Sequence, residues 1–292
     1  MKRLSLAVAF GLLSVAVSAQ QPTLGDTLNR IDTPRSVEAS IGLFHLARAP
    51  QQGILTIGHA PGGTERLVID GRDVRYAPDG TFAVGFDRDY AASVLISAFQ
   101  RDGRVVSERL PVTARSWQIS RLPAVTEHPT SDNDFQARRP AELAQIREAR
   151  ANISDAYGWR QRFIWPAHGR VSDLFGSQRI YGTVSAAPHG GVDVAIPQGT
   201  PILAPAQGIV VLAADHPFTL EGNLLMVDHG MGVNSAFLHL SKIIVTLGQH
   251  VHQGELIGYS GMTGRATGPH LHWAIKWNEE RVDPQSLVGA MH

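Results

Sequence analysis

The stretch "GYSGMTGRATGPHLHW", residues 258–273, joins a glycine-rich loop to the start of a predicted β-strand. Glycine and proline interrupt regular structure in its first part, and "HLHWAIKW", residues 270–277, then reads as a strand. Side chains two positions apart on a strand point to the same face. We therefore expect His270 and His272 to project together. The chain has 13 histidines, so this pair alone could be a coincidence.

Further short strand candidates precede this stretch, and turns containing glycine, proline or asparagine separate them. They are "FIWPAHGRVSDLFG", "GTPILAPAQGIVVLAA", "NLLMVDHG", "GVNSAFLHL", "KIIVTLGQHV" and "GELIGYSG". No helical period of any length occurs among them. Residues 163–292 are therefore predicted to form an all-β domain with antiparallel sheets.

A second group of strand candidates lies between residues 36 and 112. It comprises "GILTIGH", "ERLVID", "TFAVGF", "ASVLISAF" and "VVSERLPV", with "APDG" and "RDGR" as hairpin turns. This spacing is typical of an antiparallel sandwich. We predict a small β-sandwich-like domain over residues 20–112.

A connector over residues 113–162 is predicted to contain one helix. The helix is expected in "RPAELAQIREARANISDAY", residues 139–157, where Pro140 suits the first turn. Apolar positions recur at helical spacing at Leu143, Ile146 and Ala149/Arg150. This helical linker is expected to join the two β domains.

The first 19 residues have the pattern of a secretory signal. Lys2 and Arg3 precede an apolar run, and Val17-Ser18-Ala19 offers a small-residue cleavage site. The run is too short to span a bilayer, and no second long apolar stretch follows. We expect cleavage near Ala19, no stable membrane anchor afterwards, and a periplasmic or secreted protein.

Composition excludes several classes of function. Removing Lys2 and Arg3 from the 26 basic residues leaves 24, against 26 acidic ones. Without a basic field, nucleic acid is not expected as a partner. The chain has no cysteine, which excludes disulfides and thiolate zinc sites. An exported protein without disulfides fits the bacterial periplasm or exterior.

Metal-capable side chains cluster at three places in the second domain. They are "HGGVD" at residues 189–193, "FLHLS" around residue 239, and "PHLHW" at residues 269–273. His189 and Asp193 can share a strand face, although the two glycines between them can bend the segment. Two imidazoles and a carboxylate around an open fourth position are typical of a catalytic zinc site. Five candidates leave two for proton transfer, and spacing alone does not decide whether His270 or His272 binds the metal.

Taken in order, the three motifs resemble the lysostaphin/LytM-type zinc metallopeptidases, which are peptidoglycan endopeptidases. The family pattern is H-x(3)-D, then an H-L-S region, then a glycine-rich loop that ends in H-x-H. The resemblance covers about residues 163–288 and does not securely include the N-terminal β domain. Many members have a tyrosine two residues before the middle histidine, where this chain has Phe237. That change removes a hydroxyl but no ligand.

Residue by residue, the resemblance implies one zinc ion per chain, bound by His189, Asp193 and His272. It assigns His239 and His270 to the reaction itself. The family also contains relatives that have lost zinc ligands and act as binding modules that activate other cell-wall hydrolases. That alternative predicts a substitution at one of the five positions, and all five are present.

The implied function is an exported zinc endopeptidase that hydrolyses peptide cross-links or stems of peptidoglycan. A stem cross-link is the expected substrate for a periplasmic enzyme, and a glycine bridge is the alternative. The N-terminal β domain could bind the wall or a regulatory protein partner, cover the groove, or serve as a spacer.

Overall fold

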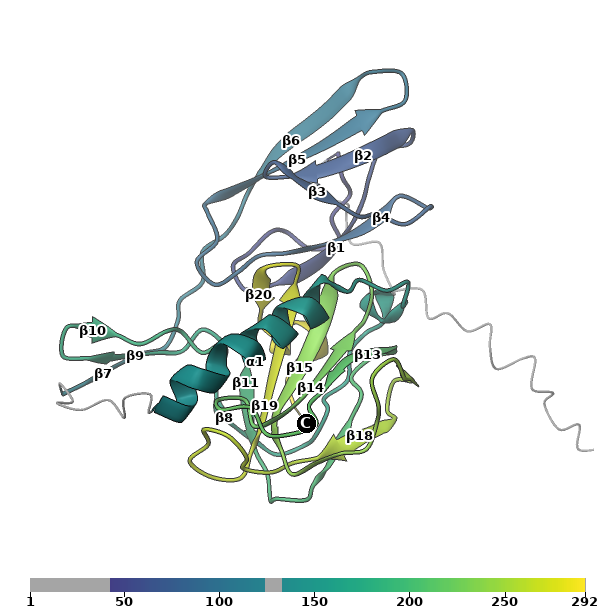
Figure 1. The fold of residues 1–292 in the computed structure, drawn as a ribbon. Coiled ribbons are helices and arrows are strands. Elements are labelled where there is room, and N and C mark those ends of the chain that lie inside the picture. The colour runs from purple at the N-terminus through teal and green to yellow at the C-terminus, as the bar shows by residue number, and fades with distance from the viewer. Residues whose placement is uncertain (1–42, 124–132, 292) are drawn as a thin grey trace, which may run out of the picture. The chain divides into compact units, whose positions relative to one another are not determined.

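The structure is a computed structural model that describes residues 43–123 and 133–291 (Figure 1). The predicted signal peptide, residues 1–19, lies outside the described residues. Within the described ranges, no helix is both long and apolar enough to cross a membrane. The described chain consists mainly of antiparallel β-structure, which confirms the predicted fold class.

The largest sheet carries most of the predicted peptidase region. Its strands pair antiparallel in the order β17 (His250–Val251), β13 (Gly208–Ala213), β14 (Asn223–Asp228), β15 (Val233–Leu240), β19 (Leu271–Trp277), β11 (Val192–Ala195) and β8 (Arg170–Asp173). Strand β20 (Glu280–Val282) also pairs with β19. The strand predicted from "HLHWAIKW" therefore lies inside the sheet, with β15 on one side and β11 and β20 on the other.

Alternation along β19 separates the two faces of this sheet. Leu271, Trp273 and Ile275 are fully buried in the main hydrophobic core. The intervening side chains point to the opposite face, and they are His272, Ala274 and Lys276. Cross-strand partners share a face, so Leu238, opposite His272, and Ala236, opposite Ala274, belong to this second face.

Helix α1 (Asn133–Ala151) covers part of the second face. Ile146 and Ala149 are buried in a separate apolar cluster with residues of the sheet, including Leu224, Met226, Ala236 and Ala274. Figure 1 shows α1 crossing over β14 and β15. The linker helix is thus part of the peptidase fold, because it closes one half of a sheet face that would otherwise expose apolar side chains.

The bounds of α1 differ from the prediction. The described helix begins at Asn133 and ends at Ala151, so Pro140 lies inside it and not in its first turn. Of the apolar positions at helical spacing, Ile146 and Ala149 are buried and Leu143 is 37% exposed, while Glu142 is buried. A proline inside a helix removes one backbone hydrogen bond. Tertiary contacts of the preceding turn, made by Arg138 and Arg139, hold the helix across that defect.

The N-terminal part forms two antiparallel sheets. One consists of β1 (Leu55–His59) and β4 (Thr81–Gly85). The other has the order β3 (Arg72–Val74), β2 (Thr64–Ile69), β5 (Ser93–Gln100) and β6 (Val105–Pro111). Each of the five predicted stretches contains a strand, and "RDGR" joins β5 to β6 with Gly103 at φ 83°.

Two small sheets complete the described chain. One has the order β12 (Pro201–Leu203), β18 (Leu256–Tyr259) and β16 (Lys242–Ile243), and the other β10 (Val184–Ser185), β9 (Gln178–Tyr181) and β7 (Ile119–Leu122). Strand β7 lies in the predicted linker and pairs parallel with β9. The short helices are η1 (Gly158–Arg160) and α2 (Gln285–Val288). The domain boundaries at residues 112 and 162 stay a prediction.

Candidate metal centre

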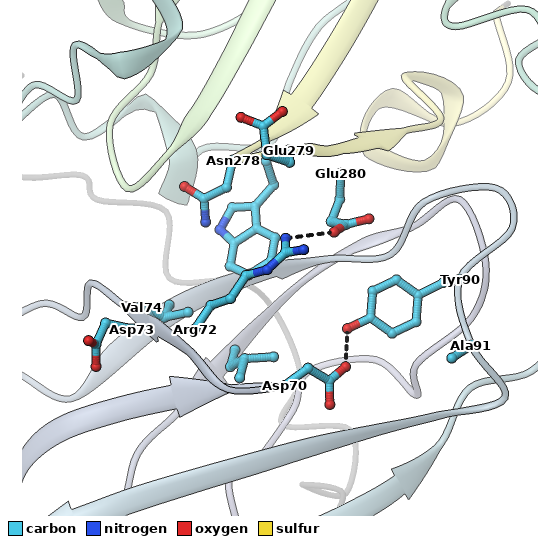
Figure 2. A pocket seen from close by; sticks show the side chains of 11 residues that line it. Asp70, Arg72, Asp73, Val74, Tyr90, Ala91, Asn278, Glu279 and Glu280 are labelled. Carbon is cyan, nitrogen blue, oxygen red and sulfur yellow. Dashed lines mark hydrogen bonds and ion pairs between the residues drawn. The ribbon is translucent and has the colours of Figure 1, made fainter.

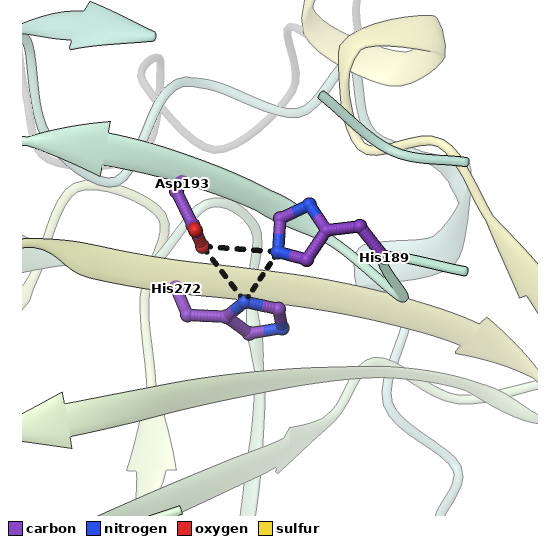
Figure 3. Close-up of side chains that lie close together, drawn as sticks. All are labelled: His189, Asp193 and His272. Atoms are coloured by element: carbon purple, nitrogen blue, oxygen red, sulfur yellow. Dashed lines mark hydrogen bonds and ion pairs between the residues drawn. The ribbon is translucent and has the colours of Figure 1, made fainter. Parts of the chain in front are cut away.

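Three of the predicted site residues meet on the second face of the large sheet (Figure 3). Asp193 on β11 pairs in register with His272 on β19, and Asp193 Oδ1 lies 2.8 Å from His272 Nδ1. His189 lies just before β11. Its Nε2 is 3.0 Å from His272 Nδ1 and 3.2 Å from Asp193 Oδ1. Three donor atoms from segments about 80 residues apart thus converge on one point.

The second glycine of "HGGVD", Gly191, allows this approach. A Cβ atom on Gly191 would lie 2.4 Å from the carbonyl oxygen of Trp273 and 2.8 Å from His272 Nε2. Any larger residue would push β11 and β19 apart at the point where their ligands meet. The close passage of the backbone therefore sets the distance between His189 and His272.

His239 reaches the site through a β-bulge. Along β15, Phe237 pairs with Leu225 and Leu240 pairs with Asn223, so Leu238 and His239 together oppose Leu224 alone. Regular alternation would turn His239 to the face of Phe237, inside the core. The bulge and a positive φ of 63° at His239 break the alternation. Bulges next to active sites re-aim side chains in this way.

His270 completes the group. It lies immediately before β19 and bridges to Gly261. Its Nε2 is 3.9 Å from Asp193 Oδ1, and the ring centroids of His239 and His270 are 4.7 Å apart. All five predicted residues therefore lie together: strand spacing accounts for His272 and Asp193 on one face, and the β-bulge adds His239.

Backbone carbonyl groups orient three of the four imidazoles. The Nδ1 atoms of His189, His239 and His270 lie 3.0, 2.8 and 2.8 Å from the carbonyl oxygens of Leu174, Thr263 and Gly268. A carbonyl oxygen only accepts hydrogen bonds, so each Nδ1 carries the proton. The neutral ring then presents a lone pair at Nε2, as metal-ligating and base histidines require.

Electrostatics favour an anionic Asp193 and neutral rings at His239 and His272. Burial works to raise the pKa of Asp193, but hydrogen bonds with His189 and His272 outweigh it and hold that pKa well below its usual range. Burial lowers the pKa of His239 to about 4 and also lowers the pKa of His272. Burial works to lower the pKa of His189, but Asp193 outweighs it and the net pKa is raised.

The donor set fits a zinc ion. Two imidazole nitrogens and one carboxylate oxygen are the usual three protein ligands of a catalytic zinc. Ligands at about 2.0–2.1 Å from a tetrahedral ion are about 3.3 Å from one another, and the three donor atoms here lie 2.8–3.2 Å apart. Three ligands leave the fourth position for water or substrate.

A network missed by sequence reasoning ties α1 to this centre. Arg139 donates to both carboxylate oxygens of Glu221 at 2.6 and 2.8 Å. Buried Glu142 accepts hydrogen bonds from the backbone and the hydroxyl of Thr219. Both partners lie in the loop between β13 and β14, and the Glu221 carbonyl accepts a hydrogen bond from the His239 amide. The helix therefore braces the loop that holds His239.

A cavity of about 370 Å³ lies elsewhere (Figure 2). Its lining comes from the turn between β2 and β3, from Tyr90, and from the turn between β19 and β20. Tyr90 donates to Asp70 there, and Arg72 lies 3.5 Å from Glu280. The five predicted site residues do not line this cavity.

Comparison with known proteins places the centre in context. The sequence pattern of Peptidase family M23 matches residues 187–284, a span that contains all five site residues. Over 116 residues the chain is 43% identical to the peptidoglycan DD-endopeptidase ShyA of Vibrio cholerae, covering 39% of this chain and 26% of that protein. It is 41% identical over 100 residues to the DD-carboxypeptidase/endopeptidase Mpg of Neisseria meningitidis, covering 34% of this chain and 23% of that one.

The matched region thus spans about a quarter of the length of these two curated relatives. A crystal structure of an M23 peptidase from Pseudomonas aeruginosa covers far more of the chain. It matches with a TM-score of 0.63 and 30% identity, over 83% of this chain and 96% of that one. The similarity therefore extends well beyond residues 187–284.

Proposed function

The chain belongs to peptidase family M23, and on that premise we propose that it is an exported zinc-dependent endopeptidase that cleaves the peptides of bacterial peptidoglycan. One observation carries the proposal: His189, Asp193 and His272 bring three donor atoms within 2.8–3.2 Å of one another. Two further histidines flank them. A silent binding module would have no need of the complete set.

His189, Asp193 and His272 would hold the zinc ion. When bound, zinc lowers the pKa of a water molecule towards neutrality and polarises the carbonyl group of the scissile amide. The chain contributes the orientation: the carbonyl of Leu174 fixes the tautomer of His189, and β-pairing fixes Asp193 opposite His272.

His239 and His270 would handle the water and the proton. Burial keeps His239 neutral at pH 7, so its Nε2 lone pair accepts a hydrogen bond from the attacking water and orients it. Nε2 of His270 is on the Asp193 side of the site. We assign His270 to take the proton of the water and deliver it to the leaving amine, as general acid–base catalysis requires.

The names of the relatives favour a stem cross-link as the substrate. One is called a DD-endopeptidase and another a DD-carboxypeptidase/endopeptidase. We therefore propose that the bond cleaved joins two D-residues of the stem cross-link, and that a glycine bridge is not the substrate. The predicted signal over residues 1–19 places the reaction in the periplasm or outside the cell. N-terminal analysis of the exported protein should find Gln20 as the first residue.

Mass spectrometry of digestion products tests the activity. Purified chain from Gln20, loaded with one zinc per molecule, should cleave cross-linked muropeptide dimers, and a chelator should abolish cleavage until zinc is restored. A glycine-bridged dimer incubated in parallel reports the alternative bond. A folded, zinc-loaded protein that cleaves neither dimer would overturn the proposal.

A further inference from the structure

Two basic side chains share the sheet face that carries the metal centre. On β19, Lys276 lies four residues beyond His272, which is about 13 Å along the strand. Lys276 pairs in register with Arg281 on β20. Because cross-strand partners share a face, Lys276 and Arg281 lie on the same face as Asp193 and His272.

Arg281 extends back towards the metal centre. A Cβ atom on Gly190 would lie 3.2 Å from both Cδ and Nε of Arg281, so this side chain passes directly over the residue next to His189. Arg281 is exposed. Its backbone amide donates to Asp87, and its guanidinium has no ion-pair partner within the described parts of the chain.

Helix α1 brings a third cation to the same place. Arg150 follows Ala149, which packs against the sheet beside Ala274. Its Nε is buried and has no hydrogen-bond partner among residues 43–123 and 133–291. Burial and then the charge of Arg281 lower the pKa of Arg150, and burial and then Arg150 lower the pKa of Lys276. Lys276 and Arg281 are cross-strand neighbours, and the charge of Arg150 acts unfavourably with both of them.

Internal acidic groups balance these charges only in part: Glu279 acts on Lys276 and Arg150, and no ion pair involves Arg281 among the described residues. Glu279 pairs with Lys276 at 3.1 Å, but its own side chain is 78% exposed. Like charges that face each other across strands destabilise a sheet, and the buried Nε of Arg150 carries a desolvation cost because it has no hydrogen-bond partner among the described residues. Long basic side chains can also cover apolar surface with their methylene groups. Such packing would not offset the desolvation of the buried Arg150 Nε, which has no hydrogen-bond partner among the described residues.

We propose that Arg281, Arg150 and Lys276 form a carboxylate-binding subsite on the His189 side of the metal centre. Guanidinium groups bind carboxylates with paired, charge-assisted hydrogen bonds. The ligand is a free carboxylate of the peptide substrate, a few residues from the bond that is cut. This inference rests on the proposed function and deepens it, because a stem peptide carries such carboxylates along its length and a glycine bridge has none.

The test uses two cross-linked peptides that differ only in whether the stem carboxylates are free or amidated. With zinc-loaded full-length mature protein, kcat/KM should be at least about tenfold higher for the free acid. Arg281→Gln should lower kcat/KM for the free-acid peptide about tenfold, through KM, and so remove the preference for the free acid over the amidated peptide. Arg150→Gln should also reduce the preference for the free acid, although Arg150 lies on helix α1 and Arg281 on strand β20. Arg147→Gln, which removes the same charge from the exposed side of α1, should leave the preference intact.

Calorimetric binding of the two peptides to the His270→Ala protein separates this inference from the proposed function. If the zinc-loaded parent protein cleaves neither peptide, but the free acid binds more tightly to His270→Ala and adding Arg281→Gln abolishes that difference, the subsite stands and the proposed activity fails. If the protein with Arg281 intact cleaves and binds the free-acid and amidated peptides equally well, the subsite is refuted. An equal loss for both peptides in Arg281→Gln also refutes it, because it shows a purely structural role.

Discussion

The closest backbone approach in the metal centre predicts the effect of Gly191→Ala. The added methyl would lie 2.4 Å from the carbonyl oxygen of Trp273 and 2.8 Å from His272 Nε2. Ordinary carbon contacts begin near 3.4 Å, so the strands must separate by about 1 Å and the His272 ring must move by about 0.6 Å. The carbonyl belongs to the backbone and cannot rotate away.

A ring displacement of that size is large beside a zinc–nitrogen bond of about 2.0 Å. We expect zinc affinity to fall about 10- to 100-fold, the range seen when ligand orientation is disturbed. The apo protein should lose about 1–3 kcal/mol of unfolding free energy, as in other overpacked sites. Competition with a chelating dye measures the first quantity, and urea unfolding of the apo protein measures the second.

Gly62→Ala is the matched control, because a Cβ atom at Gly62 meets nothing within 4 Å and its φ is not positive. That variant should bind zinc and unfold like the parent protein. A folded Gly191→Ala protein with unchanged zinc affinity would show that β11 and β19 can accommodate the added methyl group without displacing the ligands. The backbone approach at Gly191 would then not set the distance between the ligands.

Three further predictions concern the roles of single side chains. His272→Ala should lose most of its zinc by elemental analysis, whereas His270→Ala should keep zinc but lose about 10²-fold or more in kcat; equal zinc loss in both would contradict the division of roles. His229 is fully buried, and burial lowers its pKa to about 4, against about 6.5 in the unfolded chain. The neutral ring therefore contributes fully to the free energy of unfolding above pH 6.5, and this contribution is lost as the pH falls towards 4. Urea unfolding should show a drop of about 2 kcal/mol from this group between pH 7.5 and 5, and His229→Gln should lack it; parallel pH curves for the two proteins would refute the assignment. Glu142→Gln should cost about 1–3 kcal/mol, since charge-assisted hydrogen bonds to the β13–β14 loop are weakened, while exposed Glu148→Gln on the same helix should change stability by less than about 0.5 kcal/mol.

Local pattern was enough for most of the strands, and the order of the three motifs, through the family resemblance, suggested the site residues. Alternation in "HLHWAIKW" places His272 on one face and Trp273 on the other, and the structure has that arrangement. The motif spacing also selected five side chains that lie together. Period-two geometry is a property of the backbone itself, so sequence can reveal it without knowledge of the partners.

Local pattern did not predict the bounds of helix α1 correctly. Proline and apolar spacing predicted a helix over residues 139–157 with Pro140 in its first turn. The described helix already includes residues 133–139, and there Arg138 and Arg139 bind groups about 80 residues away. Helix bounds follow from such tertiary contacts as much as from intrinsic propensity.

The sequence by itself determined which residues can bind a metal and that strands would carry them. Only the tertiary structure decided how they face one another. The bulge that turns His239 out of the core depends on the partner strand β14, and the crowding of Arg150 with Lys276 and Arg281 depends on where α1 docks. Such features arise from contacts between residues distant in the chain, and the identity of a residue does not reveal which partner the fold will bring to it.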